Sequence, residues 1–292
     1  MNDIKLAVVG GDIRMIYCAK NLASRGFEVC FCGFDSGSFD CGDAVRCKTA
    51  ADAVKGAAVV ILPVPFSFDG CRINAPFSCA DIRIDDLLKE VMPAQLVTAG
   101  VCTPGFLEKA DALSLSVIDY MKDEELTVKN AISTAEGALE LAMKELPFTV
   151  HGSKTLVLGY GRVGKTVAAA FSALGSDVTV CARRRDALAW AYASGYETAD
   201  MKDICRVVRG KDIIINTVPE LVADNNVLSF IGKDALIIDL ASLPGGVDFE
   251  AAARDGLKAV HALSLPGKVA PLTAGVIIAD AVCGIMRKKG VI

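Results

Sequence analysis

Histidine is scarce in this sequence, with only His151 and His261 among 292 residues. Catalysis that depends on a histidine therefore has two candidates, and a cysteine nucleophile paired with histidine has little support. The eleven cysteines are scattered without a CxxC pair or a Cys/His cluster, so the sequence predicts no metal site. We expect most of these thiols to be small buried side chains in a protein of the reducing cytoplasm.

Long apolar runs are also missing. Hydrophobic residues make up 52% of the chain, yet charge, Gly or Pro interrupts each run before the roughly 20 residues that a membrane span needs. Residues 1–12 lack the basic region, apolar stretch and cleavage site of a signal peptide. The net charge is −4 and no basic stripe is interleaved with aromatics, which argues against a nucleic-acid partner. We expect a soluble cytoplasmic protein with a small-molecule partner and no membrane association.

The chain does contain an alternation of short apolar runs with helical segments, and this alternation occurs twice. It predicts an α/β fold of two Rossmann-like, doubly wound parallel-sheet domains. A helical pattern covers 122–146, before Pro147. The expected organisation is a first domain at 1–128 for substrate or a partner, a connecting helix at 129–150, an NADP-binding domain at 151–271, and a last helix at about 272–292 that packs back onto the first domain.

A glycine motif marks the cofactor site of the second domain. Gly159, Gly161 and Gly164 have the G-x-G-x-x-G spacing between an apolar run at 155–159 and an Ala-rich helical segment at 165–175. The first glycine permits a tight turn, the second lets the backbone approach a pyrophosphate, and the third lets helix and strand pack closely. The alternative is a structural glycine turn without a ligand.

Three arginines follow about 20 residues later, in the stretch TVCARRRD at 179–186. At this point a domain that binds NAD carries an acidic residue for the ribose hydroxyls. A guanidinium instead suits a phosphate oxygen, whereas a carboxylate repels it. We therefore predict NADP as the cofactor, with Arg183 and Arg184 on its 2′-phosphate and the adjacent Arg185 as a third candidate contact. The alternative is a solvated basic turn.

Further cofactor contacts are expected from the glycine turn and from two later strand ends, because ligands of open α/β sheets bind at the carboxyl ends of the strands. Each strand end has the alternative of being an ordinary turn. The predicted contacts are Tyr160, Arg162 and Val163 in the turn, and Thr217, Val218, Pro219, Ala241 and Ser242 at the strand ends.

Substrate contacts are predicted at a second glycine turn and in the connecting helix. Gly11 and Arg14 follow the first strand, where a substrate carboxylate meets a guanidinium and free helix amides. The alternative is that Asp12 caps the helix and Arg14 is solvated. Thr134 and Glu136 are polar residues in an otherwise apolar helix, and we predict that they contact the substrate. The alternative is that residues 133–137 only form a helix-capping arrangement.

At these residues the chain resembles the A subunits of dipicolinate synthases. The matching stretches include AVVGGDIR, NAISTAEG, VHGSKTLVLGYGRVG, DLASLPGGVDF and LPGKVAPLTAGVIIA. The resemblance implies a cytoplasmic enzyme of spore-forming bacteria that uses NADP to oxidise a dihydrodipicolinate-type intermediate of the lysine branch to dipicolinate for sporulation. It also implies a partner, the dipicolinate synthase B subunit, and leaves self-association into a homo-oligomer open. A dicarboxylate substrate adds Gly267 to the predicted anchors, Gly11 and Arg14.

Two alternatives remain at this point. A D-2-hydroxyacid dehydrogenase has the same two-domain plan, but its catalytic histidine would be expected just after Pro266, where this chain has Gly267. His261 is then the remaining acid/base candidate, and a structural role suits it better. The other alternative is a non-catalytic, NADP-sensing scaffold subunit. No catalytic group is assigned from the sequence.

Overall fold

Two parallel sheets organise the chain, whose residues 4–292 are described by a computed structural model. Contacts divide it into a first unit, residues through Lys129 with Ala270–Ile292, and a second unit, Asn130–Val269. Each unit contains one six-stranded sheet, and neighbouring strands pair in parallel. The prediction of two Rossmann-like α/β domains is confirmed.

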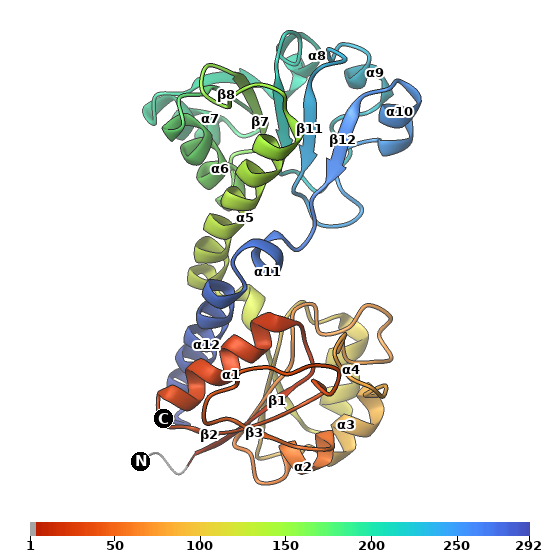
Figure 1. Ribbon diagram of the computed structural model, residues 1–292, viewed down its shortest axis with the longest axis vertical. Helices are drawn as coiled ribbons and strands as arrows, with labels where there is room; N and C mark the ends of the chain where they lie inside the picture. Colours follow the sequence, from red (N-terminus) through yellow and green to blue (C-terminus); the bar gives the residue numbers. More distant parts are fainter. Residues whose placement is uncertain (1–3) are drawn as a thin grey trace. The chain divides into compact units, whose positions relative to one another are not determined.

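The sheet of the first unit has the strand order β3-β2-β1-β4-β5-β6. Figure 1 labels its strands β1, β2 and β3. The strands are β1 (Lys5–Val9), β2 (Glu28–Cys32), β3 (Val45–Arg46), β4 (Val59–Ile61), β5 (Leu96–Ala99) and β6 (Ser116–Asp119). The helices are α1 (Ile13–Ser24), α2 (Ala50–Val54), α3 (Ile84–Glu90), α4 (Pro104–Ala112), the 3-10 turn η1 (Tyr120–Lys122), the start of α5 (Glu124–Glu145), and α12 (Pro271–Lys288).

Both faces of this sheet are covered, as the period of two along each strand requires. In β1, Leu6 and Val8 join the core beneath α1 and α12, whereas Ala7 and Val9 join the core beneath α2, α3 and α4. The apolar runs without polar interruption are therefore explained by burial on both sides.

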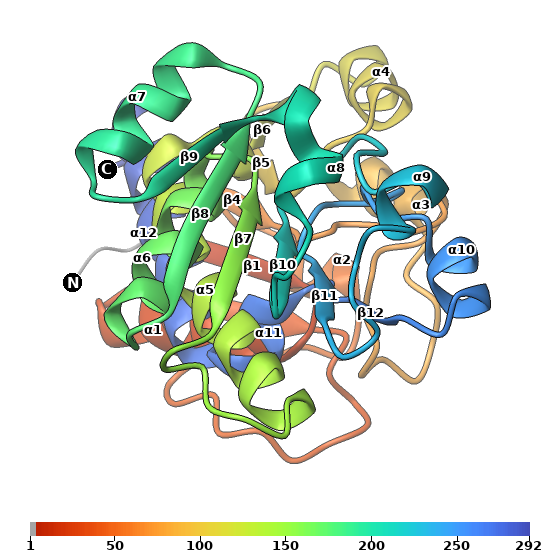
Figure 2. The ribbon, with the colours of Figure 1, turned by 90° about the horizontal axis from the view of Figure 1, so that it is seen from above.

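The second unit repeats the plan with the order β12-β11-β10-β7-β8-β9 (Figure 2). Within β10, Ile213 and Ile215 pack toward α5 and α6, and Ile214 packs toward α8, α9 and α10. The strands are β7 (Lys154–Leu158), β8 (Asp177–Ala182), β9 (Glu197–Asp200), β10 (Ile213–Asn216), β11 (Leu236–Asp239) and β12 (Lys258–His261). The helices are α6 (Arg162–Ala173), α7 (Arg185–Ala193), η2 (Met201–Asp203), α8 (Ile204–Val207), α9 (Asn225–Leu228), α10 (Phe249–Arg254) and α11 (Leu265–Val269).

Helix α5 corrects the predicted bounds of the connecting helix. It covers Glu124–Glu145 rather than 129–150. Glu124 and Glu125 lie in its first turn, where carboxylates favour the positive end of the helix dipole. The helix stops shortly before Pro147, because a residue that precedes proline disfavours helical backbone. The capping arrangement considered at 133–137 is wrong, since these residues lie inside the helix.

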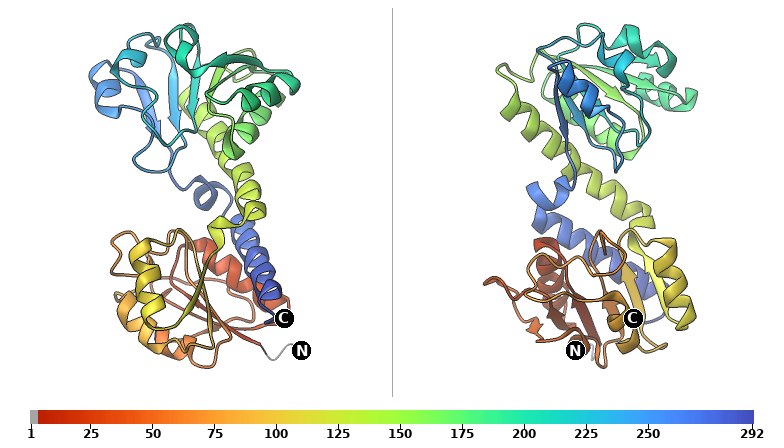
Figure 3. Two further views of the ribbon diagram at one scale, coloured as in Figure 1. Left: turned by 180° about the vertical axis from the view of Figure 1, so that it is seen from behind. Right: turned by 90° about the vertical axis from the view of Figure 1, so that its right-hand side faces the viewer.

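The C-terminal helix α12 belongs to the first unit and packs along α1 (Figures 1 and 3). The two backbones approach closely at Gly275, where an added Cβ would lie 2.5 Å from Arg14 O and 2.7 Å from Tyr17 Cβ. Only a glycine fits at this crossing without moving one helix. The chain after Ala270 thus supplies part of the first unit's core, through Ile278 and Val282 among others.

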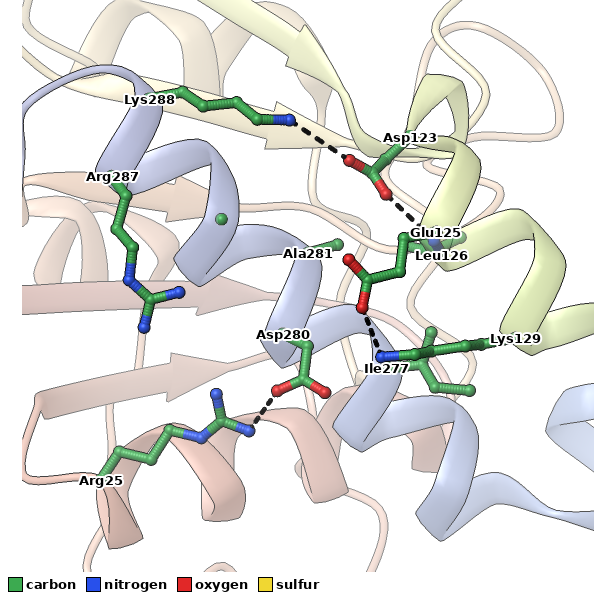
Figure 4. Close-up of a pocket in the computed structure, with 11 residues that line it drawn as sticks. Arg25, Asp123, Glu125, Leu126, Lys129, Ile277, Asp280, Ala281, Arg287 and Lys288 are labelled. Carbon is green, nitrogen blue, oxygen red and sulfur yellow. Dashed lines mark hydrogen bonds and ion pairs between the residues drawn. The ribbon is translucent and has the colours of Figure 1, made fainter.

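A cavity of about 300 Å³ lies between the end of α1, the start of α5 and α12 (Figure 4). Three ion pairs lie in its wall: Arg25–Asp280 at 2.5 Å, Lys129–Glu125 at 2.6 Å and Lys288–Asp123 at 3.7 Å. The first and third pairs join α12 to other segments of the unit. Because these charges largely neutralise one another, the cavity offers little net charge to a ligand.

Candidate functional site

The turn between β7 and α6 has the geometry of a nucleotide-binding glycine loop. Gly159 has φ +90°, and its N–H donates to Cys181 O at 2.8 Å. A Cβ at Gly159 would lie 2.6 Å from Thr217 Oγ1, and one at Gly164 would lie 2.3 Å from Gly159 O. A Cβ at Gly161 would have no described heavy atom within 4 Å. Two glycines are therefore required by packing, and the middle one leaves the backbone open.

Helix α6 begins at this open backbone. Its N-cap is Gly161, and no side chain caps its first amides. A helix of 12 residues places partial positive charge at that end. An uncapped N-terminus beside a glycine that leaves space is the arrangement that holds the pyrophosphate of a dinucleotide. The described residues of this turn thus fit a nicotinamide dinucleotide.

The predicted contacts in and near the turn divide by burial. Tyr160 is buried, and its hydroxyl donates to Ser194 Oγ at 3.3 Å, so only its backbone remains for a ligand. Val163 packs against the core of the second unit. Arg162 is exposed at the first position of α6.

The loops after β10 and β11 lie beside this turn or are tied to it. Thr217 Oγ1 donates to Leu158 O at 2.8 Å, and Val218 Cγ2 lies close to Gly159. Pro219 and Ser242 are exposed, whereas Ala241 is buried. The structure therefore brings Thr217 and Val218 against the glycine turn.

A buried carboxyl group fixes both loops, and sequence reasoning missed its role. Asp239, at the end of β11, is fully buried and accepts three hydrogen bonds. The donors are Asn216 Nδ2 at 2.7 Å, Ala241 N at 3.0 Å and Gly246 N at 2.7 Å. Asn216 Oδ1 in turn accepts from Val218 N at 3.0 Å. A polar residue at the end of each of two apolar strands was the available signal.

His261 supports the same region without acting as an open acid/base group. Its Nε2 lies 3.1 Å from Ala241 O, so Nε2 must carry the hydrogen in that bond. Its ring stacks on Phe249 with centroids 5.2 Å apart. This geometry favours the structural role for His261.

The arginines lie where β8 ends. Arg183 pairs with Glu220 at 2.8 Å, with side chains 64% and 63% exposed. Arg184 pairs with Asp186, and Arg185 is the first residue of α7. Exposed ion pairs contribute about 1 kcal/mol or less. The exposed ion pair between Arg183 and Glu220 therefore contributes little to stability.

The glycine turn of the first unit differs because the chain fills it. Asp12 caps α1 by accepting from Arg14 N, and its carboxylate also accepts from Arg14 Nε at 2.8 Å and Nη2 at 2.7 Å. Arg14 Nη2 donates further to Val64 O at 2.5 Å, and Gly11 N donates to Asn74 O at 2.7 Å. The Arg14 side chain is only 7% exposed, so the solvated alternative is wrong. The predicted substrate role of Gly11 and Arg14 stays a prediction.

The remaining substrate candidates lie in the second unit. Thr134 Oγ1 donates to Asn130 O at 3.1 Å, and Glu136 is exposed on α5. Gly267 lies within α11, and its N–H donates to Ser264 O at 3.1 Å. Their roles also stay predictions.

Two cysteines lie beside the glycine turns, Cys32 at the end of β2 and Cys181 in β8. Burial raises the pKa of each thiol to about 12. Both groups therefore stay protonated near neutral pH and are poor nucleophiles. The described residues contain no group of His, Cys, Asp and Glu arranged for a metal ion.

Comparison with known proteins gives the family of the chain. It is 32% identical, over 99% of its length and 97% of the relative, to the A subunit of dipicolinate synthase from Bacillus subtilis (strain 168). The chain belongs to the family of dipicolinate synthase A subunits. The model of the N-terminal domain of these A subunits matches residues 5–121, and that of the D-isomer specific 2-hydroxyacid dehydrogenase NAD-binding domain matches residues 106–241.

Solved structures agree with this family. The dipicolinate synthase A subunit from Bacillus halodurans superposes with a TM-score of 0.89 at 30% identity, covering 97% of this chain and 98% of that one. Its counterpart from Bacillus subtilis gives a TM-score of 0.88 at 32% identity, with 99% and 97% covered. In this member of the dipicolinate synthase family, the second unit is a dehydrogenase-like domain. The match to this domain supports oxidoreductase activity with a nicotinamide cofactor. Among the described residues, no helix is both long and apolar enough to cross a bilayer.

Proposed function

We propose that this protein is an NADP-dependent dehydrogenase subunit that oxidises a dihydrodipicolinate-type intermediate of the lysine branch to dipicolinate for sporulation. The observation that carries the proposal is the uncapped glycine turn at 159–164 together with a strand, β8, that is followed by arginines instead of an acidic residue. The relatives' name supplies the product class.

The residues of the second unit bind and orient in this proposal. Arg183 and Arg184 hold the 2′-phosphate, and the amides at the start of α6 hold the pyrophosphate. Thr217, held by its bond to Leu158 O, and Val218, held by Asn216, form the wall beyond the turn. The bound nicotinamide supplies a hydride acceptor. Because loss of hydride and a proton makes the dihydropyridine ring aromatic, positioning matters more here than a strong general base.

The dicarboxylate substrate is proposed to contact Gly11 and Arg14 in the first unit and Thr134, Glu136 and Gly267 in the second. Arg14 already holds Asp12 through its guanidinium. A carboxylate that binds Arg14 must therefore compete with Asp12. We also propose a cytoplasmic location, a partner in the form of a dipicolinate synthase B subunit, and no nucleic-acid partner.

Turnover of the purified chain tests the proposal. With NADP⁺ and freshly prepared dihydrodipicolinate, absorbance of the reduced nicotinamide is expected to rise, and equal amounts of dipicolinate should form. The assay is run with and without a B subunit, and with a D-2-hydroxyacid in place of dihydrodipicolinate. No absorbance change in either mixture contradicts the proposal and favours a sensor or scaffold role. Oxidation of the hydroxyacid alone favours the 2-hydroxyacid dehydrogenase alternative.

A further inference from the structure

The first unit contains a cavity of about 340 Å³ that the proposed reaction does not use. It lies at the carboxyl end of β2, where Gly33 and Asp35 meet the start of α2 and residues 78–90. In doubly wound sheets ligands bind outside the carboxyl ends of the strands. The cavity therefore occupies a position where this fold places a ligand.

The sequences of the two units can be aligned by a hydrogen bond that occurs at the equivalent place in each. Gly10 N donates to Cys32 O at 3.0 Å, as Gly159 N donates to Cys181 O at 2.8 Å. Counting on from these two cysteines, Asp35 matches Arg184. The first unit thus has a carboxylate where the second has its arginines. An acidic residue at this place accepts hydrogen bonds from the hydroxyls of a ribose.

The charges that line this cavity do not suit a phosphate. Four carboxylates line it, against two cations, Lys48 and Arg83. The carboxylates are those of Asp35, Asp81, Asp86 and Glu90. Asp81 and Asp86 pair with Arg72 and Lys89. The charge that repels a phosphate is therefore that of Asp35 and Glu90. In addition, the glycine turn of this unit, where phosphates bind in related folds, already holds the carboxylate of Asp12.

The wall of the cavity suits a flat, apolar ring. Ala50, Ile82 and Leu87 contribute apolar side chains. Gly33, at φ +85°, packs closely against Ile82 and Gly10, because a Cβ there would lie 3.0 Å from Ile82 Cδ1 and 3.2 Å from Gly10 Cα. The volume falls at the small end of the roughly 300–1,000 Å³ typical of small-molecule sites. One base with one sugar suits this space better than a dinucleotide.

We infer that this cavity binds a purine nucleoside without a phosphate, with Asp35 accepting hydrogen bonds from the ribose hydroxyls and the apolar wall covering the base. A two-ring base buries more apolar area than a one-ring base. The first unit then carries a nucleoside site separate from the cofactor site of the second unit.

Titration calorimetry with adenosine on the full chain tests this inference. The titration is made with and without saturating NADP⁺ and NAD⁺, because adenosine also resembles part of either cofactor. Adenosine is expected to bind under all three conditions, and AMP about tenfold more weakly because of its charge. Asp35→Asn should weaken adenosine binding about tenfold, the loss typical of a hydrogen bond to a charged group. Asp35 is exposed, so this substitution leaves the fold intact.

Two further variants locate the site. Ala50→Leu fills the cavity and should abolish binding, whereas Glu108→Gln removes an exposed carboxylate of α4 outside this cavity and should leave it unchanged. The inference is overturned if adenosine does not bind, if Asp35→Asn and Ala50→Leu bind it as the wild type does, or if AMP binds more tightly. Displacement of adenosine by spermidine at equal concentration would show an amine site instead and would also overturn it.

Discussion

Replacing Arg183 by Asp is expected to raise the KM for NADP⁺ by about 100-fold while changing the KM for NAD⁺ by less than about threefold. Arg183 lies directly after β8 and is exposed, so the substitution leaves the core intact. The variant loses a charge-assisted hydrogen bond of about 1.5–3 kcal/mol and gains a carboxylate that repels the 2′-phosphate. The same carboxylate can accept from the ribose hydroxyls of NAD⁺.

Steady-state kinetics with both cofactors measure this selectivity. Arg183→Gln separates loss of the guanidinium from repulsion and should give a smaller change, of about tenfold, for NADP⁺ alone. Arg206→Gln, an exposed arginine of α8 that pairs with nearby Asp203, is the matched control and should change neither KM. Equal increases of both KM values in Arg183→Asp would show that Arg183 does not contact the 2′-phosphate of NADP⁺.

Asp239→Ala is expected to destabilise the second unit by about 3–5 kcal/mol. The substitution leaves two buried donors, Ala241 N and Gly246 N, without an acceptor. It also removes one of the two acceptors of Asn216 Nδ2, which keeps Val218 O at 2.9 Å. An unsatisfied buried donor costs about 1–3 kcal/mol, and the bonds share one network, so the sum is smaller than that of separate losses. The loops that carry Thr217, Val218 and Ala241 lose their common support.

Two measurements check this expectation. Thermal unfolding followed by circular dichroism should show a midpoint lower by about 10 °C. Below that transition, the folded variant should bind NADP⁺ about tenfold more weakly, because the loops are no longer held. Asp234→Ala removes an exposed carboxyl group in the turn before β11 and should change neither value. An Asp239→Ala variant as stable as the Asp234→Ala control would show that the hydrogen bonds of Asp239 do not stabilise these loops.

The sequence predicted the main elements because parallel strands buried on both faces are almost wholly apolar. The runs that became β1, β7, β10 and β11 are of this kind. Short edge strands have no such pattern. Val45–Arg46 and Glu197–Asp200 include exposed and polar residues, so β3 and β9 are defined by pairing with a neighbour and not by their own composition.

The glycine turn at 159–164 could be predicted because its spacing reports on backbone requirements. The turn at 10–14 could not be interpreted in the same way, because its polar groups bond to residues that are distant in the sequence. The carbonyl oxygen of Asn74, more than 60 residues later, accepts a hydrogen bond from Gly11 N, and that of Val64 accepts one from the Arg14 guanidinium. Hydrogen bonds across such separations follow from the fold and leave no local signal. The network around Asp239 was hidden for the same reason.

Calorimetric titration of the wild-type chain with NADP⁺ and NAD⁺ at one ionic strength tests the central claim most directly. The account predicts that NADP⁺ binds at least about tenfold more tightly, because the ion pair of Arg183 with Glu220 gives way to a phosphate. Tighter binding of NAD⁺, or no binding of either cofactor, would contradict it.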